Sequence, residues 1–207
     1  MKSISKLHYI TTSASLAEQA CKGGVDWIQL RLKNTTYDEY YFIAKEVKEI
    51  CRTYNAIFII NDNVQLAKDI NADGVHLGKE DMSPAAARAL LGDNYIIGCT
   101  ANTTEDILQL TRTPVDYIGL GPYRFTGTKE NLSPILGIEG YKRVFTELPE
   151  KLNTPPVIGI GGILENDVVE LLSTGLYGIA VSGAISNAKD ITVAAKTFKE
   201  HFSYSFQ

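Results

Sequence analysis

The stretch Ala72-Asp73-Gly74-Val75 decides the fold, because it recurs as Val25-Asp26-Trp27-Ile28 and as Val115-Asp116-Tyr117-Ile118. In each copy a longer amphipathic stretch gives way to a short run of β-branched and aromatic residues. That change of period is typical of a helix followed by a strand. Leu176-Tyr177-Gly178-Ile179 repeats the pattern without the acid. The recurrence indicates one helix–strand unit used several times along the chain.

Outward from these copies, eight short apolar runs alternate with longer amphipathic stretches. Such alternation predicts parallel strands covered by helices, and eight units predict a closed (β/α)8 TIM barrel, an α/β fold. With 207 residues the barrel would be small, and we expect residues 1–207 to form a single TIM-barrel catalytic domain. The predicted strands are Leu7–Thr11, Trp27–Leu32, Ala56–Asn61, Gly74–Leu77, Ile96–Thr100, Tyr117–Gly121, Val157–Gly161 and Gly178–Ser182.

Some polar residues in this pattern are expected to be structural. Asp26, Asp73 and Asp116 stand just before predicted strands, which places them at the stability end of a barrel and away from its catalytic end. His76 lies within a predicted strand near the catalytic end. We expect it to be a hydrogen-bonded barrel histidine outside the catalytic set.

The composition argues against several classes of partner. Acidic residues outnumber basic ones by 24 to 20, and no basic run suggests a nucleic acid or an anionic membrane. The apolar runs are too short to span a membrane, and no apolar region follows the first basic residues as it would in a signal peptide. The odd, scattered cysteines Cys21, Cys51 and Cys99 indicate reduced thiols. We therefore expect a cytoplasmic protein with small-molecule partners; both a monomer and a homo-oligomer are compatible with the sequence.

A cationic cluster follows the second predicted strand. Gln29, Arg31 and Lys33 have i, i+2, i+4 spacing, which puts all three on one face of an extended chain. The apolar residues between them would face the helices, so the polar groups should point into the barrel mouth. Two cations and an amide suit a polyanion that carries a hydrogen-bonding ring. The alternative is an ordinary solvated strand end.

Two acids follow the next two predicted strands. Asp62 comes after the third and Asp81 after the fourth; neighbouring carboxylates repel each other unless a cation lies between them. Mg²⁺ commonly takes one or two protein carboxylates and completes its shell with water and substrate phosphates. Glu80 is the weaker candidate ligand. Asp62 could instead cap a helix that begins at Val64.

A second anion site is predicted where the last strands end. The stretches Gly159-Ile160-Gly161-Gly162 and Val181-Ser182-Gly183-Ala184 would let backbone N–H groups approach a phosphate at the standard phosphate site of this fold. Tight turning of the chain would also explain these glycines. The long irregular stretch Tyr123–Gly137 adds the hydroxyls of Thr126 and Thr128 and the ammonium of Lys129.

Two anion sites suggest two phosphorylated substrates. If one substrate carries a diphosphate, Mg²⁺ with Arg31, Lys33 and Lys129 would neutralise the charge that develops as pyrophosphate leaves. This electrostatic catalysis needs no nucleophilic side chain.

These motifs resemble, in order and spacing, the thiamine phosphate synthase family over nearly the whole chain. The stretches that carry the resemblance are Gln29-Leu30-Arg31-Leu32-Lys33, Asn61-Asp62, Asp73-Gly74-Val75-His76-Leu77-Gly78-Lys79-Glu80-Asp81, Gly119-Leu120-Gly121-Pro122 with Thr126-Gly127-Thr128-Lys129, and Gly159-Ile160-Gly161-Gly162-Ile163.

The resemblance implies a transferase of thiamine biosynthesis. It would condense 4-amino-2-methyl-5-(diphosphooxymethyl)pyrimidine with a thiazole (carboxylate) phosphate, giving thiamine phosphate and pyrophosphate. The implied mechanism is dissociative: the pyrimidine methylene carbon becomes a stabilised cation that the thiazole nitrogen captures.

The resemblance also assigns a role to each matched residue. The pyrimidine diphosphate would be held by Gln29, Arg31, Lys33, Asn61, Thr100 and Lys129, of which Arg31, Lys33 and Lys129 are the catalytic cations. The thiazole phosphate would be held by Thr126, Thr128, Gly162, Ser182 and Gly183, and Mg²⁺ by Asp62 and Asp81.

The chain departs from the family pattern at a few positions. Similar proteins often carry serine at the position of Thr100, histidine at that of Asn102, an aromatic-proline pair at Arg124-Phe125 and serine at Gly183.

Three other readings stay open from the sequence. A thiazole tautomerase of the same superfamily would tend to lose the diphosphate and metal residues and to use a histidine near Asn102. A Schiff-base aldolase would need a desolvated lysine, for which Lys33 or Lys129 could serve. A non-catalytic phosphate binder would release no pyrophosphate.

Overall fold

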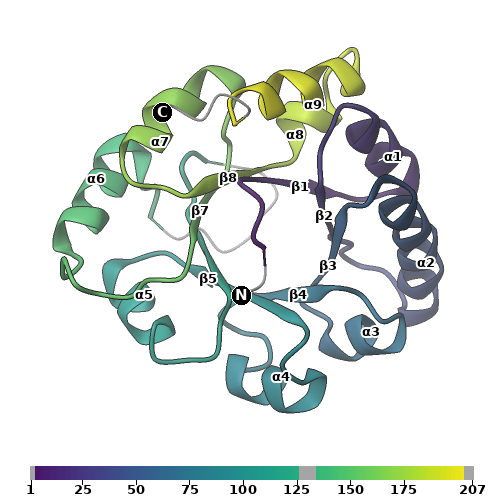
Figure 1. Ribbon diagram of the computed structural model, residues 1–207, viewed down its shortest axis with the longest axis horizontal. Coiled ribbons are helices and arrows are strands. Elements are labelled where there is room, and N and C mark those ends of the chain that lie inside the picture. The colour runs from purple at the N-terminus through teal and green to yellow at the C-terminus, as the bar shows by residue number, and fades with distance from the viewer. Residues whose placement is uncertain (1–2, 126–133, 203–207) are drawn as a thin grey trace.

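The protein folds as a closed barrel of eight parallel strands in the order of the sequence. The structure is a computed structural model that describes residues 3–125 and 134–202. Figure 1 looks along the barrel, with the strands in the centre and the helices in a ring around them. The strands are β1 (Leu7–Thr11), β2 (Trp27–Leu30), β3 (Ile57–Asn61), β4 (Gly74–Leu77), β5 (Ile96–Ala101), β6 (Tyr117–Leu120), β7 (Val157–Ile160) and β8 (Gly178–Val181). The (β/α)8 prediction is confirmed, and the strand ends differ from the predicted ones by at most two residues.

The helices lie outside the barrel; one follows each of the first six strands, a 3-10 helix and α7 follow β7, and α8 and α9 follow β8. They are α1 (Ala14–Lys22), α2 (Tyr37–Tyr54), α3 (Val64–Asp69), α4 (Pro84–Leu91), α5 (Thr104–Leu110), α6 (Gly137–Glu147), α7 (Val168–Ser173), α8 (Gly183–Ser186) and α9 (Ile191–Glu200), with the short 3-10 helix η1 (Glu165–Asp167) before α7. Side-chain caps set several of the starts: Thr36 and Glu39 form a capping box at α2, and Asn63 caps α3.

Each strand divides its side chains between two cores. In β2, Ile28 and Leu30 are fully buried against the helical layer, whereas Trp27 packs inside the barrel. Gln29 also points inward, where its amide bonds to Asn61 of β3. This alternation leaves the inward-facing positions at the carboxyl end of each strand available to line the barrel mouth.

Inside the barrel, glycines on one strand make room for rings on nearby strands. A Cβ at Gly98 would overlap the ring of Tyr117, and a Cβ at Gly119 would lie 2.9 Å from Cε1 of His76. His8 stacks on Trp27 with the ring centroids 4.0 Å apart. The interior of the barrel is therefore filled by aromatic side chains and is not a channel.

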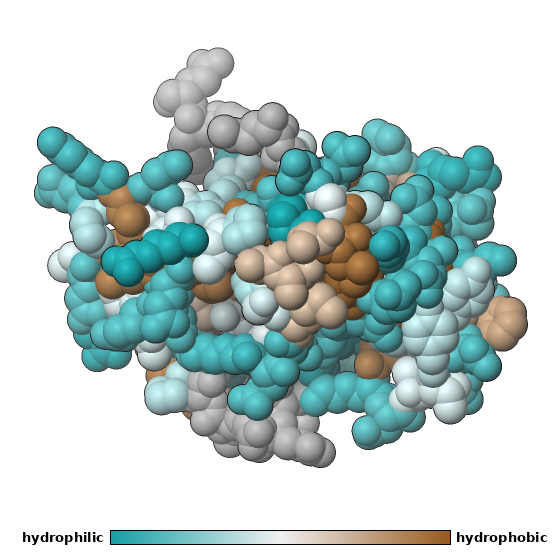
Figure 2. Space-filling model, turned by 90° about the horizontal axis from the view of Figure 1, so that it is seen from below, coloured by the Kyte–Doolittle hydropathy of each residue, from teal (hydrophilic) through white to brown (hydrophobic). Residues whose placement is uncertain are grey.

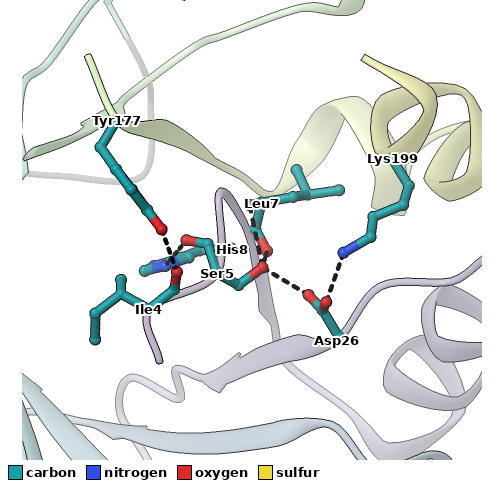
Figure 3. Close-up of polar contacts among 7 residues, drawn as sticks. All are labelled: Ile4, Ser5, Leu7, His8, Asp26, Tyr177 and Lys199. Atoms are coloured by element: carbon teal, nitrogen blue, oxygen red, sulfur yellow. Dashed lines mark hydrogen bonds and ion pairs between the residues drawn. The ribbon is translucent and has the colours of Figure 1, made fainter. Parts of the chain in front are cut away.

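The segment ahead of β1 closes the amino-terminal end of the barrel, and Figure 1 shows it lying across the central opening. Ile4 packs into the interior cluster. The hydroxyl of Tyr177 donates to the Ile4 carbonyl at 2.9 Å, and Nε2–H of His8 donates to the Ser5 carbonyl at 2.9 Å. The Ser5 hydroxyl donates to Asp26 at 2.6 Å (Figure 3).

The repeated aspartates have the structural role that we expect from the sequence. Asp73 accepts a hydrogen bond from the backbone N–H of Phe58 at 2.7 Å, and Asp116 accepts one from that of Ile97 at 2.8 Å. Each acid therefore fixes the start of the preceding strand.

The outer surface is largely hydrophilic. Figure 2 shows one side of the helical layer, on which hydrophobic residues gather in a limited area near the middle. Within residues 3–125 and 134–202, no helix is long and apolar enough to cross a membrane.

Candidate active site

The predicted site residues of β2 and β3 meet at the carboxyl end of the barrel. Nε2 of Gln29 donates to Oδ1 of Asn61 at 2.8 Å, and both side chains are buried. The hydroxyl of Tyr40, from α2, donates to the Leu30 carbonyl at 2.6 Å. The same hydroxyl lies 3.3 Å from the Asn61 carbonyl oxygen. Tyr40 thereby holds the ends of the two strands together from the outside.

Arg31 and Lys33 follow β2 but are not part of it. We predicted that the strand reaches Leu32, whereas its ladder ends at Leu30, and the Arg31 amide makes one further bond, to the Thr11 carbonyl at 2.9 Å. Arg31 is half-buried and Lys33 is exposed. The prediction that β2 extends to Leu32 is therefore wrong, because β1 ends at Thr11 and β3 at Asn61, so neither neighbouring strand offers a partner for Leu32.

The pKa of the Tyr40 hydroxyl is raised above its usual value. Burial raises the pKa of Tyr40, its backbone hydrogen bonds oppose that rise, and the charges of Asp62 and Arg31 have smaller effects of opposite sign. Tyr40 therefore stays protonated and keeps its hydroxyl as a donor to the strand ends.

Asp62 has an unusual backbone for a non-glycine residue. It lies in the left-handed region with φ 65°, directly after β3, and its N–H donates to the His76 carbonyl at 2.8 Å. The residue that caps α3 is Asn63, whose Oδ1 accepts from Leu66 N–H at 2.8 Å. The alternative role of Asp62 as the helix cap is therefore wrong.

Asp81 reaches the neighbouring strand end from a tight turn. Its Oδ2 accepts from the N–H of Gly78 at 2.6 Å, which folds the half-buried carboxylate back over the end of β4. Asn61 is paired with His76 in the ladder between β3 and β4. Asp62 and Asp81 thus follow the ends of adjacent strands at one rim, as we expect from the sequence.

This pair of acids fits Mg²⁺. Both offer hard oxygen atoms, and one or two protein carboxylates are what Mg²⁺ usually takes when substrate phosphates supply other ligands. In the part of the chain that the structure describes, no group of three or more His, Cys, Asp or Glu could form a complete protein cage for a metal. Glu80 is exposed in the turn.

Thr100 is held by a hydrogen-bonded chain inside the barrel. Its hydroxyl lies 3.1 Å from Nε2 of His76, and Nδ1 of His76 lies 2.9 Å from the hydroxyl of Tyr117. Burial raises the pKa of Tyr117 well above its usual value, so its hydroxyl stays protonated. The expectation that His76 is a hydrogen-bonded barrel histidine is confirmed.

The turns after β7 and β8 supply the glycines of the predicted phosphate site. Gly161 and Gly162 have φ of 100° and 70°, conformations that favour glycine. Ser182 and Gly183 are exposed, and Gly183 starts the one-turn helix α8. Three further predicted residues, Thr126, Thr128 and Lys129, lie outside the described residues.

The structure also shows polar contacts at this rim that the sequence analysis missed. Asn102 is buried, and its amide donates to the Gly121 carbonyl, which ties the end of β5 to that of β6. Arg124 forms an ion pair with Asp167 at 2.6 Å. The departures from the family pattern at Asn102 and Arg124 were the only signal; neither partner could be found from spacing, because each contact joins different loops.

A closed barrel with cations, amides and carboxylates at the carboxyl ends of its strands defines the class of this protein as a (β/α)8-barrel enzyme. A family model described as "Thiamine monophosphate synthase" matches residues 4–185. The chain therefore belongs to the thiamine monophosphate synthase family.

Individual relatives agree with this assignment. A protein of Flavobacterium psychrophilum named "Thiamine-phosphate synthase" is 50% identical over 191 residues, which cover 89% of this chain and 93% of the relative. One of the same name from Bacteroides thetaiotaomicron is 48% identical, covering 88% and 87%. A solved structure, "Thiamine phosphate pyrophosphorylase from Pyrococcus furiosus", matches with a TM-score of 0.82 and 32% identity, covering 94% of each chain.

Proposed function

We propose that this enzyme catalyses the reaction for which its family is named, joining the pyrimidine diphosphate to the thiazole phosphate with release of pyrophosphate. One observation carries the proposal: the hydrogen-bonded amides of Gln29 and Asn61 lie at the same rim as Arg31, Asp62 and Asp81, on three consecutive strand ends. The amides suit a heteroaromatic ring, and the charged groups suit a diphosphate with its metal ion.

The diphosphate end of the first substrate would be bound by Arg31 and Lys33, together with Lys129. Mg²⁺, held by Asp62 and Asp81, would supply positive charge to the diphosphate oxygens when bound. The bond between the methylene carbon and the diphosphate oxygen breaks, and its electron pair leaves with pyrophosphate. Because the cations stabilise this departing charge, no nucleophilic side chain is needed.

The pyrimidine ring would be oriented by Gln29 and Asn61 on one side and by Thr100 on the other. The His76–Tyr117 chain behind Thr100 restricts where its hydroxyl can point. A fixed ring keeps the methylene carbon facing the second substrate, so that the thiazole nitrogen forms the new carbon–nitrogen bond as the cation appears.

The thiazole phosphate would be bound by backbone N–H groups at Gly162 and Gly183 and by the hydroxyl of Ser182, with Thr126 and Thr128 from the preceding loop. Amide donors at a strand-to-helix turn are a common way to bind phosphate in this fold.

The rival activities fit less well. A Schiff-base lysine needs a desolvated amine, whereas Lys33 is exposed; Lys129, the other candidate, lies outside the described residues. A tautomerase of the superfamily would use a histidine near position 102, whereas Asn102 is buried and donates to a backbone carbonyl.

The direct test is to mix both substrates, Mg²⁺ and the enzyme and to measure pyrophosphate and thiamine phosphate. We expect equal amounts of the two products, and no product when Mg²⁺ is removed with a chelator. Binding of the thiazole phosphate without pyrophosphate release would point to a non-catalytic phosphate binder instead.

A further inference from the structure

Arg124 joins the loop after β6 to the turn after β7. Its Nη1 and Nη2 each lie 2.6 Å from an oxygen of Asp167, in a two-pronged ion pair. Nη1 also donates to the Gly162 carbonyl at 2.8 Å, and the Arg124 backbone N–H donates to the Gly161 carbonyl at 2.8 Å. One residue therefore holds two successive peptide groups of the glycine turn.

The surroundings hold this arginine in place. Asp167 also accepts from the Leu164 N–H at 2.8 Å, and its side chain is only 11% exposed, against 44% for Arg124. The guanidinium stacks over the ring of Tyr123, with 4.7 Å from Cζ to the ring centroid. The hydrogen bonds from Arg124 contribute most to holding the pKa of Asp167 below its usual value, so the pair stays charged at neutral pH.

These two carbonyl contacts fix where the next two amides point. In a trans peptide the C=O and the following N–H point in opposite directions. Since Arg124 binds the carbonyls of Gly161 and Gly162, the N–H groups of Gly162 and Ile163 point away from it. Neither of these amides donates a hydrogen bond to any residue within 3–125 or 134–202.

We propose that Arg124 is a positioning residue for the second substrate: with Asp167 it orients the Gly162 and Ile163 amides toward the phosphate of the thiazole. This inference rests on the proposed function, because it takes the glycine turn as the phosphate site. The arginine itself binds peptide carbonyls and a carboxylate, so its proposed role is to position the amides and not to bind the phosphate.

The two-pronged geometry is what gives the pair this role. A partly exposed ion pair adds little to overall stability. Two parallel hydrogen bonds to a carboxylate, however, fix the plane of the guanidinium. A lysine at this position keeps the charge but cannot bind Asp167 and the Gly162 carbonyl in one fixed plane.

Steady-state kinetics of single variants test the proposal. For Arg124→Ala we expect KM for the thiazole phosphate to rise about tenfold, with KM for the pyrimidine diphosphate unchanged. Arg124→Lys should recover only a small part of the loss. Arg143→Ala, which removes an exposed arginine from α6, is the matched control and should leave both KM values unchanged.

Asp167→Asn separates orientation from simple charge. If Arg124 acted through its positive charge, loss of the neighbouring carboxylate would strengthen phosphate binding and lower this KM. If it acts by orienting the turn, the same variant raises the KM severalfold. Direct binding of the thiazole phosphate, measured by calorimetry with each variant, should follow the same order.

The outcomes are distinct from those for the proposed function. If the wild-type enzyme makes thiamine phosphate and Arg124→Ala leaves the thiazole KM unchanged, or raises both KM values equally, the positioning role is wrong and the function stands. Full recovery by Arg124→Lys would also overturn it. If Arg124→Ala does not fold, the Lys and Asn variants still decide.

Discussion

Asp62 combines a strained backbone with a proposed metal-binding carboxylate. The left-handed φ of 65° costs about 1 kcal/mol or more for most residues, but asparagine and aspartate tolerate it. Asn is therefore the substitution that removes the charge without adding strain.

We predict that Asp62→Asn loses at least about a hundredfold in kcat, because Mg²⁺ would lose one of its two carboxylate ligands and the departing diphosphate would lose the charge that the ion supplies. Thiazole phosphate binding and the thermal midpoint should stay close to wild type. Turnover and calorimetry measure the two effects. Equal loss of turnover and of thiazole phosphate binding would argue that Asp62 is structural.

Gly98 is required by its neighbour on the next strand. Because a Cβ would overlap the Tyr117 ring, we predict that Gly98→Ala lowers the free energy of unfolding by about 1–3 kcal/mol or more, the range for overpacked cores. Urea denaturation measures the change, and Ala85→Ser on the exposed face of α4 serves as a surface control. An unchanged midpoint for Gly98→Ala would mean that Tyr117 can move aside.

Much of the site could be predicted at this scale. The position of Gln29 follows from strand alternation, that of Asn61 from the family resemblance, and those of the two aspartates from their places after consecutive strands. The pairing of Arg124 with Asp167 could not, because a contact between residues 43 apart depends on how two loops approach each other.

At the scale of elements, α2 supports the mouth of the barrel. The hydroxyl of its Tyr40 donates to a backbone carbonyl at the end of β2 and lies close to a backbone carbonyl at the end of β3. The helix thereby fixes the separation of the two strand ends that carry Gln29 and Asn61.

We predict that Tyr40→Phe lowers the free energy of unfolding by about 1–3 kcal/mol, since buried carbonyls lose their donor. It should also raise KM for the pyrimidine diphosphate more than KM for the thiazole phosphate. Tyr54→Phe, at the far end of the same helix, is the control. A variant with normal kinetics for both substrates would show that α2 does not set the spacing.

Element order was predictable because each strand carries its own apolar run and each helix its own period. Element ends were less so. The end of β2 at Leu30 depends on backbone bonds to the neighbouring strands, which local pattern does not reveal. The cap of α3 is a local side-chain bond, but it comes from Asn63 and not from its neighbour Asp62.

At the scale of the whole molecule, the barrel buries a histidine in its neutral form. Burial, opposed by the Ser5 bond and assisted by the charge of His76, lowers the pKa of His8 from 6.5 to about 3. The unfolded chain therefore binds a proton below about pH 6.5 that the folded protein takes up only near pH 3. Stability should fall as the pH decreases through this window, by up to about 1.4 kcal/mol per pH unit.

We predict that His8→Gln, which keeps a donor for the Ser5 carbonyl, makes the free energy of unfolding less dependent on pH. The slope should fall by up to the amount that corresponds to one bound proton. Urea unfolding between pH 4.5 and 7 compares the slopes, and His201→Gln, near the end of the described chain, is the control. The same slope in His8→Gln as in wild type would assign the acid sensitivity to other groups.

The cytoplasmic location, the oligomeric state and the single-domain extent over residues 1–207 stay predictions.

The segment ahead of β1, Ser3–Lys6, closes the end of the barrel at which the strands begin. The proposed active site lies at the opposite end, where the strands end. A protein anchored to a bead or fused to a carrier through its first residues would therefore keep its mouth facing the solution. Immobilisation through that terminus should leave diffusion of both substrates unhindered.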